Sequence, residues 1–342
     1  MQATAWYTAF LMRREELEIH VPISPTPNFL NRVHYLAASL ELHGGRFAHA
    51  PIVVTVGDDR EPFDIEDYLG WPTRYNIEWR WLPRSEYLRD TFYATALKRF
   101  TYDFSARHVL MLDADVIVRG RIDELIDAVE RDQAFYGMTA LASPWHSLWN
   151  ERSHEEWWRL VFDEADLGPV PYVSQHSCWG VLWGKETPRM SPPYFNLGVL
   201  AAPADLMSSI GNVILENMRS VERVREFIYK VQIALTLAVV KTKTPWKELS
   251  MRFNMANHPV IAAAYPAEAD AARIMHYLCG DVQDFQKNID MESVESVDAW
   301  LARPFAGAGE IERQLRECFQ AVHPRVMREA VHAAGLSRVV PV

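Results

Sequence analysis

The sequence has few cysteines, no long apolar run and no excess of basic residues. Its 342 residues include three cysteines, Cys178, Cys279 and Cys318, which are far apart and form no Cys-x-x-Cys pair. A disulfide scaffold and a structural zinc site are therefore not expected, and a reducing compartment is the default. The longest nearly continuous apolar run, 233–240, has eight residues, one of which is Thr, whereas a helix that spans a membrane needs about 20.

The N-terminal segment MQATAWYTAFLMRREEL lacks the basic start, apolar stretch and small-residue cleavage site of a secretory signal. We therefore expect a cytoplasmic protein without a transmembrane segment. The formal net charge is −10, from 35 Lys and Arg against 45 Asp and Glu. This balance argues against a nucleic-acid partner bound by bulk electrostatics. It does not exclude a nucleotide, because a few local ligands or a metal ion can offset phosphate charge.

Hydrophobic residues make up 49% of the sequence and charged residues 23%, which is typical of a folded globular chain with a sizeable core. Apolar runs predict strands, and helical periodicity predicts helices. The predicted order is strand 17–24, helix 28–43, strands 51–56 and 77–82, helix 91–104, strand 109–118, helix 122–130 and strand 134–139. Asn28 is the expected cap of the first helix. This alternation predicts an α/β fold with a mostly parallel sheet flanked by helices, whose ligands bind beyond the carboxyl ends of the strands.

The segment 143–194 interrupts this pattern, because it has poor periodicity and many aromatic residues. Six of the twelve tryptophans fall in it: Trp145, Trp149, Trp157, Trp158, Trp179 and Trp183. Flat aromatic faces suit an acceptor-binding side, and the alternative is that they pack the core of a large insertion.

Regular structure returns after this insertion. The pattern predicts a strand at 195–202, a long helical stretch at 208–240 and a last strand at 273–278. The final residues predict helices with a break near 304–309. We therefore expect one domain at 1–290, which contains the insertion at 143–194, and a C-terminal helical extension at 291–342.

Two carboxylates interrupt an apolar run in the segment HVLMLDADVIVRG. Asp113 and Asp115 follow four apolar residues and precede three more, and burying them is costly unless something compensates their charge. If this segment is one strand, residues two apart point to the same side, so the carboxylates converge. Their repulsion raises one pKa, and Mn²⁺ or Mg²⁺ would remove that cost. The alternative is that the two acids pair with Arg or Lys.

Two classes of enzyme place such an acidic pair at the end of a strand. Haloacid-dehalogenase-type phosphatases use the first Asp as nucleophile, and the segment 280–284 (GDVQD) resembles their distal acidic motif. Glycosyltransferases of the GT-A fold use the pair to hold a metal on the diphosphate of a nucleotide sugar. The phosphatase nucleophile normally follows the first strand of its domain, whereas several strand-like segments precede Asp113.

With these motifs in view, the chain resembles GT-A fold glycosyltransferases, most closely family 8, the glycogenin-like and galactosyltransferase group. Four landmarks occur in the expected order. They are 21–40 (first strand and helix, whose junction meets the nucleotide), 109–118 (metal motif), 193–203 (PYFNLGVLAAP, the strand near the donor sugar) and 271–280 (AARIMHYLCG, an apolar strand ending in a metal-binding His and a phosphate-side Gly). The segment 231–239 resembles a helix that usually begins Asp-Gln.

The resemblance implies a metal-dependent sugar transfer from a UDP-sugar to an unidentified acceptor, with retention. It implies Mn²⁺ or Mg²⁺ held by Asp113, Asp115 and His276, and Gln232 facing the reacting sugar. The implied donor-binding residues are Ser24, Asp113, Asn196, Gly198, Gly280 and Lys287. The residue types suit these roles, because imidazole nitrogen suits Mn²⁺, amides suit sugar hydroxyls, and glycine lets a backbone approach a ligand. The alternatives are that His276 is a packed core residue, that Gln232 is an amide on a helix surface and that Gly198 marks a strand bulge.

The sequence departs from the family pattern at Val231, where the family usually has an Asp that contacts the donor sugar. We expect Val231 to form an apolar wall beside Gln232. An inverting enzyme would need a carboxylate base. The insertion offers four candidate acids, whose alternative reading is a solvated helix face: Glu155, Glu156, Asp163 and Glu164. Besides the transferase, two functions stay open, a phosphatase that uses Asp113 as nucleophile and a non-catalytic protein that binds a nucleotide sugar or glycan.

Overall fold

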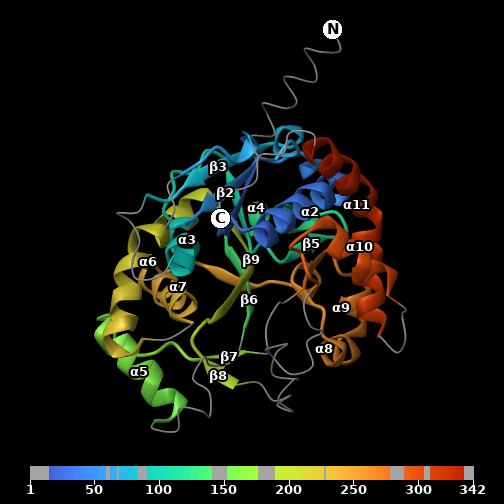
Figure 1. Ribbon diagram of the computed structural model, residues 1–342. Helices are drawn as coiled ribbons and strands as arrows, with labels where there is room; N and C mark the ends of the chain where they lie inside the picture. The colour runs from blue at the N-terminus through green and yellow to red at the C-terminus, as the bar shows by residue number, and fades with distance from the viewer. Residues whose placement is uncertain are drawn as a thin grey trace.

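A computed structural model of the protein describes residues 15–58, 62–67, 69–83, 91–140, 152–175, 189–226, 229–277, 289–303 and 309–334. Its centre is a seven-stranded sheet with strand order β10-β6-β9-β4-β1-β2-β3. The strands are β1 (Leu17–Ile23), β2 (Ile52–Val56), β3 (Ile77–Trp81), β4 (His108–Leu112), β6 (Phe135–Thr139), β9 (Phe195–Pro203) and β10 (Trp246–Glu248). All run parallel except β9, which is antiparallel to both β4 and β6. The predicted α/β fold with a mostly parallel sheet is confirmed (Figure 1).

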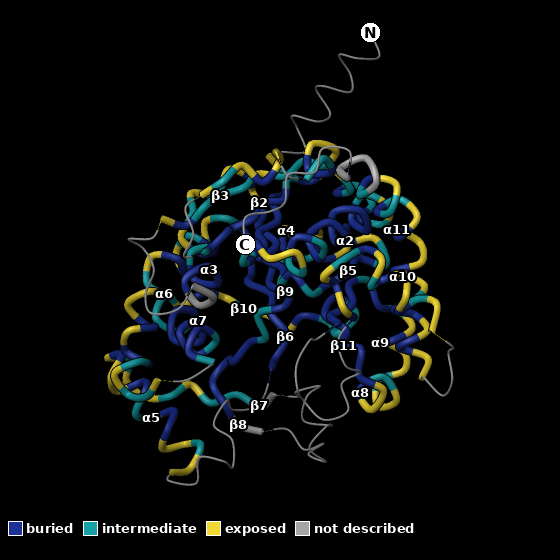
Figure 2. Tube along the Cα trace, in the orientation of Figure 1, coloured by how far each residue is buried: buried dark blue, intermediate teal, exposed yellow. Residues whose placement is uncertain are grey.

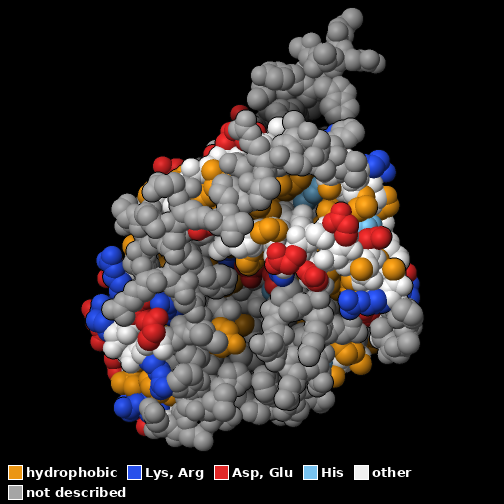
Figure 3. All heavy atoms as spheres, viewed as in Figure 1, with side chains coloured by type: hydrophobic (Ala, Val, Ile, Leu, Met, Phe, Trp, Pro, Cys, Tyr) orange, Lys and Arg blue, Asp and Glu red, His pale blue; other side chains and the backbone are white. Residues whose placement is uncertain are grey.

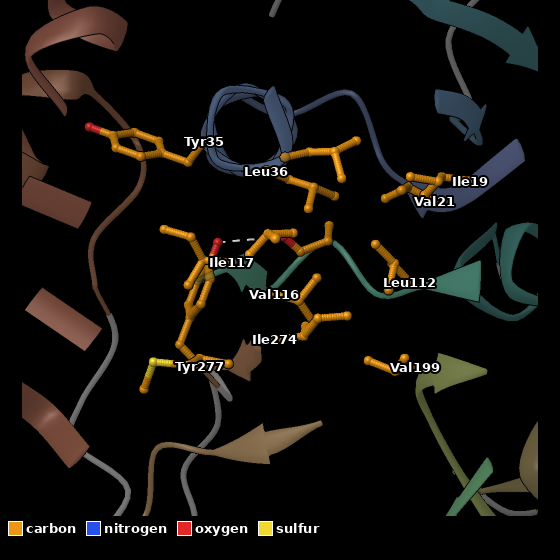
Figure 4. Packing of buried hydrophobic residues seen from close by; sticks show 14 of the residues in the cluster. Ile19, Val21, Tyr35, Leu36, Leu112, Val116, Ile117, Val199, Ile274 and Tyr277 are labelled. Carbon is orange, nitrogen blue, oxygen red and sulfur yellow. Dashed lines mark hydrogen bonds between the residues drawn. The ribbon is translucent and has the colours of Figure 1, made fainter. Parts of the chain in front are cut away.

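The central strands are buried on both faces, which explains why they read as apolar runs. In β4 every residue is buried, and successive side chains point to opposite layers. Leu110 and Leu112 join the apolar cluster that includes Leu36, whereas Val109 and Met111 join the cluster on the other face. Figure 4 shows the first layer, with Leu36 above β4 and β5. The strands form the buried interior in Figure 2, and the outer faces of the helices are exposed.

Helices cover both faces of the sheet. The helices α2 (Pro27–His43), α10 (Val294–Ala302) and α11 (Glu310–Ala334) lie on one side, and α3 (Thr91–Lys98), α6 (Ala204–Val224) and α7 (Lys230–Lys241) lie on the other (Figure 1). The C-terminal helix α11 packs along α2, where the Tyr35 hydroxyl and His323 Nδ1 lie 2.5 Å apart. Among the described residues, no helix combines the length and the apolar character needed to cross a bilayer.

Three sequence predictions about helices need correction. The cap of α2 is Thr26, whose hydroxyl accepts from Phe29 N at 3.4 Å; Asn28 lies inside the helix and accepts from Arg32 Nε instead. The helix expected at 91–104 ends at Lys98 as α3. The stretch 208–240 is two helices, α6 and α7, which pack against each other. The sequence predicted one helical stretch because apolar residues recur at helical spacing on both sides of the break.

The acidic segment also differs from prediction. The strand expected at 109–118 is two strands, β4 and β5 (Val116–Val118), separated by a turn that contains Ala114 and Asp115. The strand β5 belongs to a second sheet with β11 (Met255–Ala256) and β12 (Ile274–His276). A strand buried on both faces does not readily hold two carboxylates, and here the chain turns so that both carboxylates leave the sheet. Strand alternation therefore does not bring them together.

The remaining elements lie outside the central sheet. They are α4 (Asp123–Asp132), α5 (His154–Glu164), β7 (Val173–Gln175), β8 (Arg189–Ser191), α8 (Pro259–Ala264) and α9 (Pro266–Asp270), with short 3₁₀ turns between them. The helix α5 begins at a capping box formed by Ser153 and Glu156. It is the described helical part of the tryptophan-rich insertion.

Candidate functional site

Asp113, Asp115 and His276 come together at the carboxyl edge of the main sheet. Asp113 follows β4, Asp115 precedes β5, and His276 ends β12 opposite Val116. One ligand atom from each lies within 4.8 Å of the others, and His276 Nε2 is 3.2 Å from Asp115 Oδ1. Within the described part of the chain, no other three His, Cys, Asp or Glu side chains meet in this way. The two oxygen donors and one nitrogen donor suit Mn²⁺ or Mg²⁺.

Other predicted residues lie at the same edge because of the strand directions. The strands β1, β4 and β6 end there, and the antiparallel β9 begins there, so Asp113 N donates to Gly198 O at 3.0 Å. Ser24 lies at this edge where β1 passes into α2. Figure 3 shows acidic side chains near the centre of one face of the molecule and mixed charges toward its rim.

Two arginines that the sequence reasoning missed face the acidic pair. Arg99 is fully buried, and its Nη1 lies 3.2 Å from Asp113 Oδ1. Arg32 Nη1 lies 3.8 Å from Asp115 Oδ2. The alternative expectation, that the acids pair with arginines, is therefore also realised. Even so, the side chains of Asp113 and Asp115 remain 32% and 19% exposed, so their carboxylates keep access to a ligand.

These charges shift the three ionisable groups in different directions. Removal from bulk water raises the pKa of Asp113, and Arg99 offsets this only in part. Desolvation acts in the same sense on Asp115, but His276 and Arg32 together hold its pKa below the ordinary value. Burial alone would lower the pKa of His276, and the neighbouring carboxylates outweigh it and raise that pKa. The carboxylates thus favour a proton on His276, which a bound cation would displace.

Gly198 lies against the His276 ring, and Asn196 is linked to His276 through Asn254. A Cβ at position 198 would lie 2.4 Å from His276 Cε1, so the missing side chain makes room for the imidazole. Asn196 Oδ1 accepts from Gly198 N at 2.8 Å and from Asn254 Nδ2 at 2.9 Å. Asn254 in turn lies 3.0 Å from His276 Nδ1. Sequence reasoning missed Asn254, for which the available signal was an amide between two apolar residues, Phe253 and Met255.

Gln232 lies in the first turn of α7, and its Oε1 accepts from the hydroxyl of Tyr194, two residues before Asn196. Val231 differs from the expectation of an apolar wall facing a sugar. It is 3% exposed and packs with Phe195 and Leu200 in the apolar cluster behind the sheet. Gly280, Lys287 and the segment 280–284 lie outside the described residues.

The described tryptophans of the insertion are core residues. Trp157 and Trp158 are buried in a cluster with Val161 and Tyr194, and the other four tryptophans lie outside the described residues. The four candidate bases of the insertion lie on exposed positions of α5: Glu155, Glu156, Asp163 and Glu164. Glu156 completes the capping box, and Glu164 accepts from Arg223. Their exposure fits the reading of a solvated helix face.

The fold and the position of the site define an α/β protein with the GT-A glycosyltransferase fold. No family model and no curated protein sequence matches the chain. Among solved structures, an active-site mutant of LgtC matches with a TM-score of 0.51 and 15% identity, covering 95% of this chain and 97% of that one. Galactosyltransferase LgtC with donor and acceptor sugar analogues matches with a TM-score of 0.49 and 16% identity over 89% and 96% of the two chains. The bifunctional glycosyltransferase WbbM matches with a TM-score of 0.45 and 10% identity over 88% and 51%. The likeness to the LgtC mutant shows the fold, and the GT-A prediction is confirmed.

Proposed function

We propose that this protein is a metal-dependent glycosyltransferase that moves a sugar from a UDP-sugar to a hydroxyl acceptor with retention. The observation that carries the proposal is the convergence of Asp113, Asp115 and His276 at the carboxyl edge of a GT-A sheet. Open α/β sheets bind their ligands beyond this edge. LgtC, whose mutant shares the fold, is described as a galactosyltransferase. The nucleotide and the stereochemistry rest on the family resemblance.

Asp113, Asp115 and His276 would hold the metal ion, and Mn²⁺ suits their mixed oxygen and nitrogen donors better than Mg²⁺ does. When bound, such an ion stabilises the negative charge that develops on the departing nucleoside diphosphate. Arg99 holds the Asp113 carboxylate in place, since the same guanidinium donates to the carbonyl oxygens of Leu112 and Leu197. It thereby ties the end of β4 to the beginning of β9.

The charge balance predicts that metal and nucleotide bind together. Arg32 and Arg99 already offset the two carboxylates, so a divalent ion alone would leave the site with excess positive charge. A nucleoside diphosphate removes that excess. We therefore expect the metal to bind weakly by itself and more tightly with the nucleotide.

The remaining donor contacts are proposals for which placement at the carboxyl edge is the support. Ser24, Asn196 and Gly198 lie at this edge, and Gln232 lies beside Tyr194 at the start of β9. We propose that Gln232 faces the donor sugar. Gly280 and Lys287 are proposed for the phosphates on the resemblance alone.

One observation favours a second candidate, a non-catalytic protein that binds a nucleotide sugar. Val231 occupies the place of the family's sugar-binding Asp and is buried in the core. Nothing comparable favours a phosphatase, because Asp113 follows the fourth strand along the chain and Arg99 engages its carboxylate.

Thermal unfolding in the presence of single nucleotides, with and without Mn²⁺, tests the proposal. A ligand at 100 times its dissociation constant stabilises by about 2.7 kcal/mol. We expect UDP to stabilise the protein only together with Mn²⁺, and release of UDP from a UDP-sugar in the presence of an acceptor. Stabilisation without any turnover across donors and acceptors would favour the binding protein, and no nucleotide effect would contradict both.

A further inference from the structure

The hydrogen bonds behind His276 have directions that follow from one another. The backbone N–H of Gly198 can only donate, and it lies 2.8 Å from Asn196 Oδ1. This contact fixes the orientation of the Asn196 amide, so the group that Asn254 presents to the same oxygen must be its NH₂, at 2.9 Å. The carbonyl oxygen of Asn254 therefore faces His276 Nδ1, 3.0 Å away. Because that oxygen can only accept, Nδ1 must carry a proton.

We infer that Asn254 is a positioning residue for His276, which fixes the proton on Nδ1 and so leaves Nε2 to bind the metal. The inference rests on the proposed function, since it assigns Asn254 to the metal site of that reaction. Asn196 in turn orients Asn254, because its Oδ1 accepts a hydrogen bond from the Asn254 NH₂. With the other tautomer, the Nδ1 lone pair would face the Asn254 oxygen, and Nε2 would carry a proton in the direction of Asp115. Metal-bound histidines commonly donate their second ring nitrogen to a fixed acceptor in this way.

The surroundings hold the ring and the amide in this arrangement. Asn254 is 1% exposed and His276 is 2% exposed, so water does not readily replace their hydrogen bond. Asn254 directly precedes β11, which pairs with β12 so that Ala256 lies opposite His276. The imidazole occupies the space that a Cβ at position 198 would need, at 2.5 Å from Nδ1. A rotated ring would place carbon against the Asn254 oxygen and leave that oxygen unpaired.

Mn²⁺ affinity of the full-length protein in the presence of UDP, measured by electron paramagnetic resonance of the free ion, tests the inference. The Asn254→Leu variant should bind Mn²⁺ about 10–100-fold more weakly, which is typical when the partner of a metal-bound histidine is removed. Asn254→Asp keeps an acceptor oxygen for Nδ1 but replaces the NH₂ that donates to Asn196 Oδ1, and it should bind Mn²⁺ more tightly than Asn254→Leu does. Asn217→Leu is the matched control, because Asn217 is an equally buried amide on α6, and it should bind Mn²⁺ as the wild type does.

A second measurement reports the tautomer directly. Ring nitrogen NMR of the Mg²⁺-loaded protein, with His276 assigned from a His276→Asn variant, should show the proton on Nδ1 in the wild type and in Asn254→Asp. If Asn254→Leu fails to fold, Asn254→Asp and the wild-type tautomer still decide the matter. A proton on Nε2, or wild-type Mn²⁺ affinity in Asn254→Leu, would overturn the inference.

The outcomes separate this inference from the proposed function. If Mn²⁺ binding requires Asp115 but not Asn254, the metal site stands and the positioning role fails. If the wild type binds no Mn²⁺ even with UDP present, or binds it equally well without Asp115, the metal site itself is wrong and the positioning role falls with it.

Discussion

Arg99 Nη1 lies 3.2 Å from Asp113 Oδ1, and the guanidinium that makes this contact is fully buried beneath the acidic pair. The same group donates to Leu112 O at 3.1 Å and to Leu197 O at 3.3 Å. The Arg99 guanidinium, a cation, thus lies directly beneath the site at which we propose that a metal cation binds. This arrangement lets the two carboxylates persist at the edge of an apolar sheet before any ligand arrives.

Arg99→Met should destabilise the protein because it removes the charge partner of Asp113 and a hydrogen-bond donor to two backbone carbonyls. We expect a loss of about 3 kcal/mol in the free energy of unfolding, at the lower end for a broken buried ion pair because Asp113 is partly exposed. Urea denaturation measures it. Arg107→Met is the control, because Arg107 is 65% exposed and lies 3.7 Å from Glu130; such surface pairs contribute about 0–1 kcal/mol. Equal effects in the two variants would contradict a special role for Arg99.

Arg32→Gln should strengthen Mn²⁺ binding in the absence of nucleotide. The change removes one positive charge whose Nη1 lies 3.8 Å from Asp115 Oδ2, and an interaction of about 1 kcal/mol corresponds to roughly fivefold in affinity. The gain in Mn²⁺ affinity on adding UDP should shrink, because less excess charge remains for the diphosphate to offset. Calorimetric titration measures both. Arg121→Gln is the control, since that side chain is 72% exposed and pairs with Asp123. Weaker Mn²⁺ binding in Arg32→Gln would show that the charge balance is not what limits metal affinity.

The contact between α11 and α2 should make the stability of the fold depend on pH, because it contains the ionisable side chain of Glu329. Burial would raise the pKa of Glu329, but hydrogen bonds from His34, Arg325 and Tyr75 lower it from 4.5 to about 2, and Arg74 Nη1 also lies 3.9 Å away. Because the folded-state pKa is depressed, the carboxylate stabilises the fold above pH 4.5, and this contribution is lost as the pH falls toward about 2.

Glu329→Gln should therefore cost about 3 kcal/mol at neutral pH, and the difference from the wild type should narrow between pH 5 and pH 3, where denaturant titrations can follow it. Glu317→Gln provides the control, because Glu317 on the same helix is 49% exposed. A difference that stays constant over this pH range would show that the Glu329 carboxylate is not stabilised by its neighbours.

Gln232→Ala should lower turnover more than it weakens nucleotide binding, because the nucleotide is held mainly by the metal and the first strand. Loss of one polar contact made at the reacting centre costs about 100-fold in kcat. Tyr194→Phe is the matched variant, since it removes only the hydroxyl that donates to Gln232, and it should have a smaller effect. Steady-state kinetics and UDP titration separate the two quantities. If Gln232→Ala loses turnover and affinity in equal measure, Gln232 is a structural residue.

The sequence was informative where one local pattern has one physical cause. Continuous apolar runs predicted β2 and β4 because parallel strands are buried on both faces. The three residues proposed to hold the metal were predicted because carboxylates inside an apolar run need a compensating partner, and because the family resemblance implies a metal-binding histidine at the end of an apolar strand. Their convergence is confirmed, although a turn at Asp115 produces it rather than strand alternation.

The partners of these residues could not be predicted, because they come from distant segments. Arg99 and Arg32 lie within apolar helical patterns that give no sign of an acidic neighbour. Asn254 acquires its role only when β11 pairs with β12. The break between α6 and α7 was missed because apolar periodicity continues from one helix to the next, and a chain reversal leaves no mark in such a pattern.

Calorimetric titration of UDP into Asp115→Asn and wild-type protein, each with and without Mn²⁺, is the most direct test of the proposed metal site. Asn keeps the size of the side chain and removes the charge that a metal needs, and Asp127→Asn, at a 51% exposed position on α4, is the control. We expect Mn²⁺ to strengthen UDP binding to the wild type and to Asp127→Asn but to have no effect on Asp115→Asn, which should still unfold cooperatively. Equal strengthening by Mn²⁺ in all three proteins would contradict the metal site.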